Sequence, residues 1–184
     1  MEISSLVRRR AALLALVGTG IGAALSVSCG SMQRPDGGRG LLSAGASAPD
    51  FTGRDAFDKP VRLSETAGRP RIVYFYPKDE TPGCTKEACA FRDAFEEYKK
   101  RGVALFGVSR DTEESHRKFR ENHQLPFFLV ADPNGDVQRA YGVPGHLGFA
   151  SRVTFLVDAS GKILHVWEKV DPAVHSAEVL AELK

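Results

Sequence analysis

The sequence predicts an α/β fold in which a central mixed β-sheet is flanked by helices. Short apolar runs rich in β-branched and aromatic residues alternate along the chain with segments of helical periodicity. This order is typical of a sheet with helices on both faces. The turn Asp158-Ala-Ser-Gly161 is a strong hairpin signal between two late strands, so the sheet should contain antiparallel as well as parallel pairs. The 184 residues suffice for one such domain with additional segments.

The first half of the domain contains the strand that we expect at the centre of the sheet. Asp55–Leu63 predicts a short strand or hairpin, and Ser64–Gly68 predicts one capped helical turn. Arg71–Tyr76 is an aromatic and β-branched run that predicts a buried strand. Pro77 ends this strand, because proline cannot donate to the ladder. After a tight turn at Pro82-Gly83, apolar residues at spacings of three and four predict a helix from Cys84 to about Arg101.

The second half alternates further strands with shorter helices. Asp111 is expected to cap its helix, with acidic residues in the first turn, where they suit the helix dipole. The expected elements are the strand Val103–Ser109, the helix Asp111–His123, the strand Phe127–Val130, the short helix Val137–Tyr141, the glycine-rich loop Gly142–Ala150, the strands Ser151–Val157 and Lys162–Glu168, and the helix Val174–Leu183.

Residues 1–28 are predicted to be a targeting signal. Arg8-Arg-Arg10 is cationic, and Ala11–Val27 is apolar with many small residues. At about 17 residues, the apolar stretch is borderline for spanning a bilayer. We therefore expect export to a bacterial cell envelope, by an ordinary secretion signal or by the twin-arginine route.

The end of this signal leaves the mode of export open. Ser26 and Ser28 satisfy a small-x-small cleavage rule, which would release a periplasmic protein. Leu25-Ser-Val-Ser-Cys29 also resembles a bacterial lipobox, in which Cys29 would be lipidated and anchored to the membrane, although leucine stands one place too early. An uncleaved anchor is a further alternative. Residues 29–47, rich in Gly, Ser, Ala and Pro, are predicted to be a flexible linker to a domain over residues 48–184.

Composition and charge exclude several functional classes. The chain is 42% hydrophobic and 26% charged, which is typical of a soluble globular protein. Its formal charge of +2 comes from the first 28 residues, and the remainder holds 22 basic and 22 acidic residues. A neutral domain without a basic stripe gives no electrostatic reason to expect nucleic-acid binding. Three cysteines are too few for a disulfide scaffold, and the five scattered histidines show no metal-binding spacing.

Cys84 is the strongest candidate for a reactive residue. It lies in the first turn of the predicted helix, where unpaired backbone N–H groups and the positive end of the dipole favour an anion. For a cysteine that anion is the thiolate, which is the nucleophilic form. A cysteine in an apolar helix is otherwise a buried packing residue, so the flanking Thr81-Pro-Gly carries much of this interpretation.

Cys89 is the candidate partner of Cys84 in a reversible disulfide. Five residues along a helix amount to about 140° of rotation and roughly 7.5 Å of rise. The two sulfur atoms then face different sides, and the α-carbons lie beyond the roughly 7 Å limit for bridging. The two cysteines can pair only if the first helical turns unwind. Such a bond is a poor structural link, but it can form and break in a catalytic cycle.

The active-site region resembles the peroxiredoxin family. Pro77-x-x-x-Thr81-x-x-Cys84 is similar to the peroxiredoxin signature, and Thr81–Asp93 is similar to its PrxQ, or bacterioferritin comigratory protein, branch. The resemblance extends from about Ala48 to the C-terminus, including Ser151–Asp158, and excludes the first 47 residues. It implies a thioredoxin-like fold, which also fits the predicted order of elements.

The resemblance also implies a function and roles for individual residues. Cys84 would be the peroxidatic cysteine, which is oxidised by hydrogen peroxide or an organic hydroperoxide to a sulfenic acid. Cys89 would be the resolving cysteine, which attacks that sulfenic acid. Arg152 would lie beside the sulfur and stabilise the thiolate and the transition state. Thr81 would direct its hydroxyl at the thiolate or the peroxide, and Pro77 would shield the thiolate from water.

The expected partners follow from the same resemblance. A thioredoxin-like protein would reduce the Cys84–Cys89 disulfide by exchange, without metal, flavin or haem. The protein would be a monomer or weak homodimer, and only its N-terminal lipid or signal would contact a membrane. A disulfide oxidoreductase would want Cys-x-x-Cys, which the chain lacks. A peroxide-sensing relay without significant turnover remains an alternative, since it needs the same two cysteines.

Overall fold

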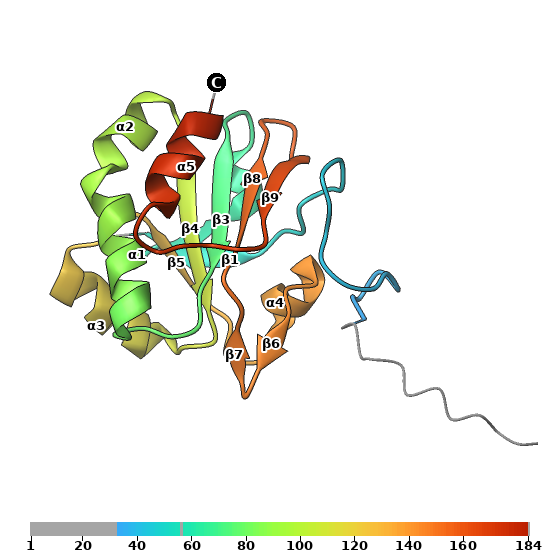
Figure 1. Ribbon diagram of the computed structural model, residues 1–184, viewed down its shortest axis with the longest axis horizontal. Coiled ribbons are helices and arrows are strands. Elements are labelled where there is room, and N and C mark those ends of the chain that lie inside the picture. Colours follow the sequence, from blue (N-terminus) through green and yellow to red (C-terminus); the bar gives the residue numbers. More distant parts are fainter. Residues whose placement is uncertain (1–32, 56, 184) are drawn as a thin grey trace, which may run out of the picture.

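The computed structural model describes residues 33–55 and 57–183 (Figure 1). Within these ranges, the main sheet has seven strands in the order β2-β1-β5-β4-β3-β8-β9. The central strands β3 (Arg71–Phe75), β4 (Ala104–Ser109) and β5 (Phe128–Ala131) are parallel. Antiparallel strands β8 (Val153–Val157) and β9 (Ile163–Trp167) extend one side of the sheet. The predicted mixed sheet flanked by helices is therefore confirmed.

The other elements connect or cover these strands. They are β1 (Thr52–Arg54), β2 (Pro60–Arg62), the 3₁₀ turn η1 (Leu63–Thr66), α1 (Pro82–Asp93), α2 (Phe95–Lys100), α3 (Glu113–His123), α4 (Asp136–Tyr141), the two-residue strands β6 (Gly145–His146) and β7 (Phe149–Ala150), and α5 (His175–Glu182).

Alternation along β3 gives the sheet two apolar faces. Ile72 and Tyr74 lie on the face that is covered by α1, α2, α3 and α5, where they belong to one buried cluster with Phe91. Val73 and Phe75 belong to the cluster on the opposite face. Successive strand residues point to opposite faces, so a strand buried on both sides reads as the continuous apolar run that predicted it.

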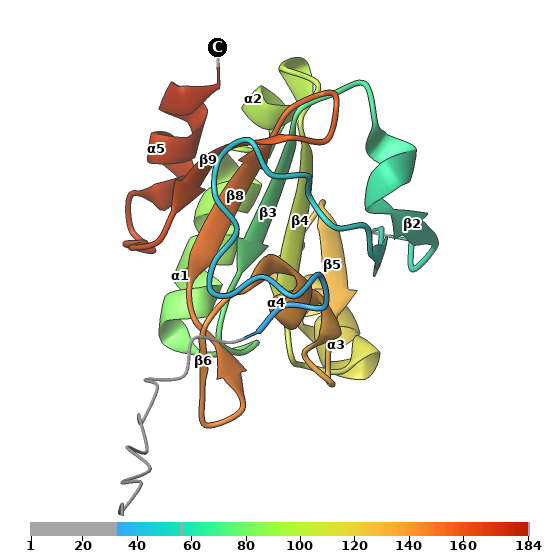
Figure 2. The same ribbon diagram turned by 90° about the vertical axis from the view of Figure 1, so that its right-hand side faces the viewer.

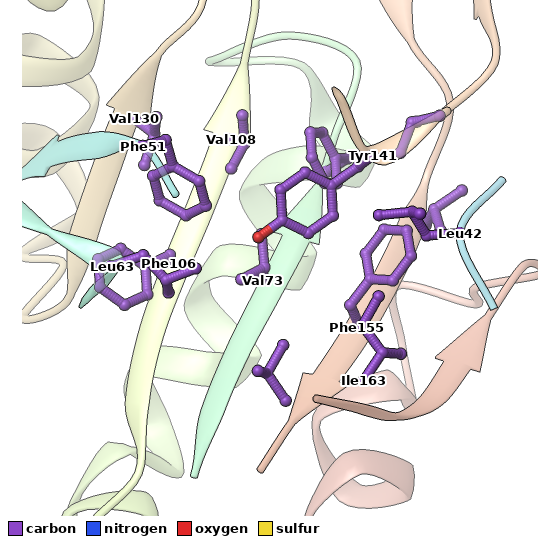
Figure 3. Close-up of a cluster of buried hydrophobic side chains, with 14 of the residues drawn as sticks. Leu42, Phe51, Leu63, Val73, Phe106, Val108, Val130, Tyr141, Phe155 and Ile163 are labelled. Carbon is purple, nitrogen blue, oxygen red and sulfur yellow. The ribbon is translucent and has the colours of Figure 1, made fainter. Parts of the chain in front are cut away.

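The second face is covered by α4 and by the chain before β1. In Figure 3, Tyr141 of α4 lies between Phe51 and Phe155, with ring centroids 6.0 and 5.1 Å away. Leu42 completes this cluster and is only 7% exposed. Figure 2 shows the segment around Leu42, in blue, crossing this face of the sheet together with α4.

The predicted flexible linker is wrong for its second half. The backbone N–H of Leu42 donates to Tyr141, and that of Gly45 donates to Ile163, at N···O distances of 3.0 and 2.8 Å. The N–H of Ile163 donates in turn to Ala46 at 2.9 Å. Burial of Leu42 and pairing with the edge strand β9 fix residues 42–48 on the domain. The predicted signal over residues 1–28 and the lipidation candidate Cys29 lie outside the described residues.

The predicted helix from Cys84 to Arg101 is two helices. α1 ends at Asp93, and α2 begins at Phe95 after Ala94, whose φ of −91° and ψ of 2° depart from helical values. The change of direction brings Tyr98 into the core, where its hydroxyl donates to the Ser176 carbonyl at 2.7 Å. The break between α1 and α2 therefore goes together with the packing of Tyr98 in the core. The spacing of apolar residues in the sequence does not reveal this packing.

Two smaller predictions also differ from the structure. Thr112, and not Asp111, caps α3, because the Thr112 hydroxyl accepts the Ser115 N–H at 3.2 Å. The predicted loop Gly142–Ala150 contains the hairpin β6–β7. Within residues 33–55 and 57–183, no helix has the length and apolar character needed to cross a membrane.

Gly107 offers a test of the packing between β4 and β3. A β-carbon at this position would lie 2.6 Å from the hydroxyl oxygen of Tyr74. We expect Gly107→Ala to lower the free energy of unfolding by about 1–3 kcal/mol, since both residues are buried and overpacking costs that much. Chemical denaturation measures the change.

Tyr74→Phe provides the companion variant. The Tyr74 hydroxyl is buried and has no hydrogen-bond partner among the described residues, so its removal should leave stability unchanged or raise it by up to about 1 kcal/mol. The double variant should recover part of the loss, because the closest contact is gone. A Gly107→Ala protein as stable as the wild type would contradict this packing.

Candidate active site

The loop after β3 delivers Cys84 to the start of α1. Thr81 is the N-cap, with an extended φ of −76° and ψ of 144°, and Pro82 and Gly83 are the first two residues of the helix. The predicted tight turn at Pro82-Gly83 is therefore helical, and proline suits the first position because its missing N–H would be unpaired there anyway. Cys84 follows in the first turn and is 1% exposed.

The helix start supplies backbone donors beside the sulfur. Among the described residues, no group accepts a hydrogen bond from the N–H of Gly83 or Cys84. The first N–H groups of a helix carry the positive end of its dipole. An anion at the Cys84 side chain, or an oxygen that gains charge beside it, is therefore stabilised from the backbone.

Arg152 reaches the same sulfur from the neighbouring strand. β8 pairs antiparallel with β3, with Val153 opposite Phe75, so the residue before Val153 lies beside the loop that follows β3. The Nη2 atom of Arg152 donates to Cys84 Sγ at 3.2 Å. The sheet register thus brings together two predicted residues that lie 68 positions apart in the sequence.

Glu87 adds a buried carboxylate to this site, and the sequence had assigned it no role. The Nη1 atom of Arg152 donates to Glu87 Oε2 at 2.5 Å, so one guanidinium bridges the sulfur and the carboxylate. Glu87 lies one turn after Cys84 and is 1% exposed. Glu87 follows Cys84 by three residues, and side chains at this spacing lie on the same face of a helix. This spacing could have indicated from the sequence that the two side chains are neighbours.

Glu87 and Arg152 differ in whether their charge changes near neutral pH. Burial raises the pKa of Glu87 to about 7, although Arg152 acts in the opposite direction. Burial by itself lowers the pKa of Arg152, but the charges of Glu87 and Cys84 outweigh it, so the pKa of Arg152 is raised. The guanidinium therefore stays charged, whereas the carboxyl changes its charge near neutral pH.

Gly83 makes room for the guanidinium. A β-carbon at Gly83 would lie 2.9 Å from Nη2 of Arg152, closer than a side chain tolerates. The role of this glycine was missed, because in sequence Pro-Gly indicates only a turn.

Thr81 and Pro77 flank the site without contacting the sulfur by hydrogen bond. The Thr81 hydroxyl donates to the Lys78 carbonyl at 2.9 Å. With its proton committed, the hydroxyl oxygen can only accept a hydrogen bond from a bound molecule. Pro77 is half-buried directly after Tyr76, whose N–H pairs with Val108 of β4 at 3.0 Å.

Cys89 lies farther along the same helix and is not bonded to Cys84. Both cysteines are free, with Cys84 buried and Cys89 partly exposed. α1 is continuous from Pro82 to Asp93, so the separation that the sequence predicts for the two sulfur atoms applies to this state. Across residues 33–55 and 57–183, no cluster of three or more His, Cys, Asp or Glu side chains could hold a metal ion.

The chain is similar to proteins of one family over most of the described residues. The AhpC/TSA family model matches residues 44–166. A putative chloroplastic peroxiredoxin Q of Oryza sativa subsp. indica is 43% identical over 148 residues, which cover 79% of this chain and 68% of that protein.

Solved structures agree with this similarity. The peroxidoxin BcpB of Mycobacterium tuberculosis has a TM-score of 0.70 at 34% identity, and the match covers 77% of this chain and 96% of that one. The bacterioferritin comigratory protein of Xanthomonas campestris, whose trapped intermediate and ligand complexes concern alkyl peroxide reduction, has a TM-score of 0.68 at 33% identity, with coverages of 78% and 95%. The thioredoxin-like fold expected from the sequence is confirmed by these neighbours.

The predicted location in a bacterial cell envelope is wrong by the same comparisons. Plant relatives at 42–43% identity are named as chloroplastic proteins, and these names contradict the expected location. The sequence of the first 28 residues does not separate the two locations, since export signals and transit peptides share features. Both kinds of leader contain arginine, and the first 28 residues here are also poor in acidic residues and contain several serines, as transit peptides do.

The contact between Gly83 and Arg152 can be tested by thiol chemistry. We expect Gly83→Ala to slow alkylation of Cys84 by iodoacetamide about 5-fold at neutral pH, because the new β-carbon displaces a charge-assisted hydrogen bond of ~1 kcal/mol from the thiolate. A background of Cys29→Ser and Cys89→Ser restricts the reaction to Cys84, and mass spectrometry follows it. Lys86→Ala, on the exposed side of α1, is the control. An unchanged rate for Gly83→Ala would show that Arg152 does not need this space.

Proposed function

Because this chain belongs to the AhpC/TSA family and is a thiol peroxidase of the peroxiredoxin Q group, we propose that Cys84 is its peroxidatic cysteine. The observation that supports this role most directly is the 3.2 Å contact between Arg152 Nη2 and Cys84 Sγ. A buried sulfur beside a guanidinium and free backbone N–H groups is poised to be a thiolate.

The peroxide step follows from these contacts. The Cys84 thiolate attacks one oxygen of an uncharged hydroperoxide in line with the O–O bond. That bond breaks, the sulfur gains oxygen as a sulfenic acid, and the second oxygen leaves with the electron pair and takes up a proton. Arg152 stabilises the negative charge that passes from the sulfur to the leaving oxygen. Thr81 accepts a hydrogen bond from the peroxide and orients it, while Pro77 limits the access of water.

Cys89 is proposed to resolve the sulfenic acid. Its thiol attacks the Cys84 sulfur, which forms the disulfide and releases water. Both residues belong to the continuous helix α1, so the first turns of α1 unwind during this step and re-form after reduction. A thioredoxin-like dithiol protein would restore the two thiols by exchange.

The substrate class is proposed to include both hydrogen peroxide and organic hydroperoxides. The Xanthomonas campestris protein is described as having alkyl peroxide reduction activity, and its match covers 78% of this chain. The sensing relay without turnover is not favoured, because the similar proteins are named for peroxidase chemistry.

The two cysteines should differ sharply in their effects on turnover. Cys84→Ser is expected to reduce peroxide consumption to the background rate, because no other described thiol lies beside Arg152. Cys89→Ser should still form the sulfenic acid, but it should turn over only with a reductant that attacks sulfenic acid directly. Coupled assays with a thioredoxin system and with dithiothreitol separate the two cases. Full activity in Cys84→Ser would overturn the assignment.

The titration of Glu87 should appear in the pH profile. Below about pH 6 the Glu87 carboxyl is mostly neutral, since its pKa is about 7, so Glu87→Gln should react with peroxide at nearly the wild-type rate. As the pH rises through about 7 the wild-type carboxylate becomes charged and holds Arg152 more firmly. A charge-assisted hydrogen bond exceeds a neutral one by ~1 kcal/mol, so the wild type should be about 5-fold faster at pH 8. Stopped-flow rates from pH 5 to 9 test this, and parallel profiles would contradict it.

A further inference from the structure

The loop between β3 and α1 is bonded to α3 by two consecutive side chains that have no role in the chemistry described above. These are Asp79 and Glu80, which immediately precede the helix cap Thr81. Asp79 is buried, with 4% of its surface exposed. A buried carboxylate is costly unless hydrogen bonds compensate it, so its partners indicate what it holds.

Asp79 accepts three hydrogen bonds from two elements. The Tyr76 hydroxyl at the end of β3 donates at 2.8 Å, and on α3 the Ser115 hydroxyl and His116 Nδ1 donate at 2.7 and 2.9 Å. Burial alone would raise the pKa of Asp79, but His116, Ser115 and Tyr76 together lower it. The group is therefore a carboxylate at neutral pH and can only accept, which places the shared proton on Nδ1 of His116.

The backbone on either side of this carboxylate is also fixed. The Asp79 N–H donates to Asp111 Oδ2 at 2.9 Å, and that carboxylate also accepts the Ser109 hydroxyl at 2.6 Å. Asp111, which was expected to cap α3, thus attaches the loop to the end of β4 instead.

Glu80 attaches the loop to the other end of α3. Its φ of 59° is left-handed, which costs a non-glycine residue about 1 kcal/mol or more. Its carboxylate accepts Asn122 Nδ2 and His123 Nε2, each at 2.9 Å. Seven residues of α3 separate the two attachment points, roughly 10 Å along the helix. The loop that directly precedes Thr81 and Cys84 is therefore bonded to α3 at both ends of that helix.

We propose that Asp79 is a positioning residue for the peroxide reaction, because its bonds to Ser115 and His116 of α3 hold the Pro77–Thr81 loop where the first turn of α1 presents Cys84 to Arg152. This proposal rests on the proposed function and adds a residue that does not contact the sulfur. Asp79 acts through the backbone of the loop, and its partners are Tyr76, directly after β3, and two residues of α3.

The attachment has a specific consequence for the catalytic cycle. Pairing of Cys84 with Cys89 requires unwinding of α1, which lies after the attached loop in the chain. The bonds of Asp79 can stay intact during this opening, so the first turn re-forms on the same support and Sγ returns to Arg152. Loosening the loop therefore slows oxidation of Cys84 by peroxide, but it does not slow formation of the disulfide.

Asp79→Asn is the principal test, made in the full chain. The amide nitrogen of the new asparagine would then face a hydrogen-bond donor, and the negative charge of Asp79 that orients His116 would be lost. We expect the second-order rate constant for sulfenic acid formation to fall about 10-fold, while the rate of the following disulfide step stays equal or rises. Rapid-quench mass spectrometry separates the two steps. His116→Leu should behave likewise, whereas His116→Asn, which keeps a donor near Nδ1, should restore most of the rate.

Asp132→Asn is the matched control. Asp132 is also 4% exposed and its carboxylate accepts the N–H groups of Val137 and Gln138 at 3.1 and 2.8 Å, at the start of α4. This variant should lose thermal stability without a change in the peroxide rate. If Asp79→Asn reacts like the wild type well below its melting temperature, or if both steps slow equally, the positioning role is wrong.

Hydrogen exchange separates failure of this proposal from failure of the proposed function. The amide of Thr85, which is bonded to the Thr81 carbonyl at 2.9 Å, should exchange faster in Asp79→Asn than in the wild type or Asp132→Asn. A wild-type protein inert to peroxide would refute the peroxidase assignment, and the exchange data would still decide whether Asp79 holds the loop. Unchanged exchange across residues 79–85 would refute the positioning role even in an active enzyme.

Discussion

The contact between the Arg152 guanidinium and the Cys84 sulfur is the interaction on which the proposed active site depends. It joins the start of one strand to the first turn of a helix, and it exists because β8 lies antiparallel beside β3 with Val153 opposite Phe75. A shift of this register by one residue would turn Arg152 to the other face of the sheet. The reactivity of one sulfur is thus set by the pairing of two buried strands.

The half-buried Arg152 is paired with a fully buried carboxylate, that of Glu87. The carboxylate accepts the second branch of the guanidinium from a position one turn further along α1. Because burial raises the pKa of Glu87 to about 7, this carboxylate is only partly charged at neutral pH. Glycine at position 83 leaves the space that the Arg152 guanidinium occupies, since a β-carbon there would lie too close to it.

In the proposed catalytic cycle, one part of the fold stays fixed and another part opens. Arg152 lies at the end of the central sheet, whose two faces are closed by aromatic clusters. The first turns of α1 carry both thiols and have to unwind for them to meet. Phe91, near the end of α1, is packed on Tyr74 at a centroid distance of 4.8 Å. The loop before α1 is bonded to α3 on the fixed side of this boundary.

The sequence by itself determined the strands, the helical position of Cys84 and the need to unwind before Cys89 can reach it, because these follow from local periodicity and helix geometry. Similarity to a known motif added Arg152. Only the tertiary structure decided the break at Ala94, the docking of Leu42 on the sheet, and the contacts of Gly83, Glu87 and Asp79. Each of these depends on a partner far away in the chain, and in the local sequence they indicate only a helix, a linker, a turn or a surface charge. Burial converts such ordinary residues into parts of the site, and burial is a property of the assembled fold.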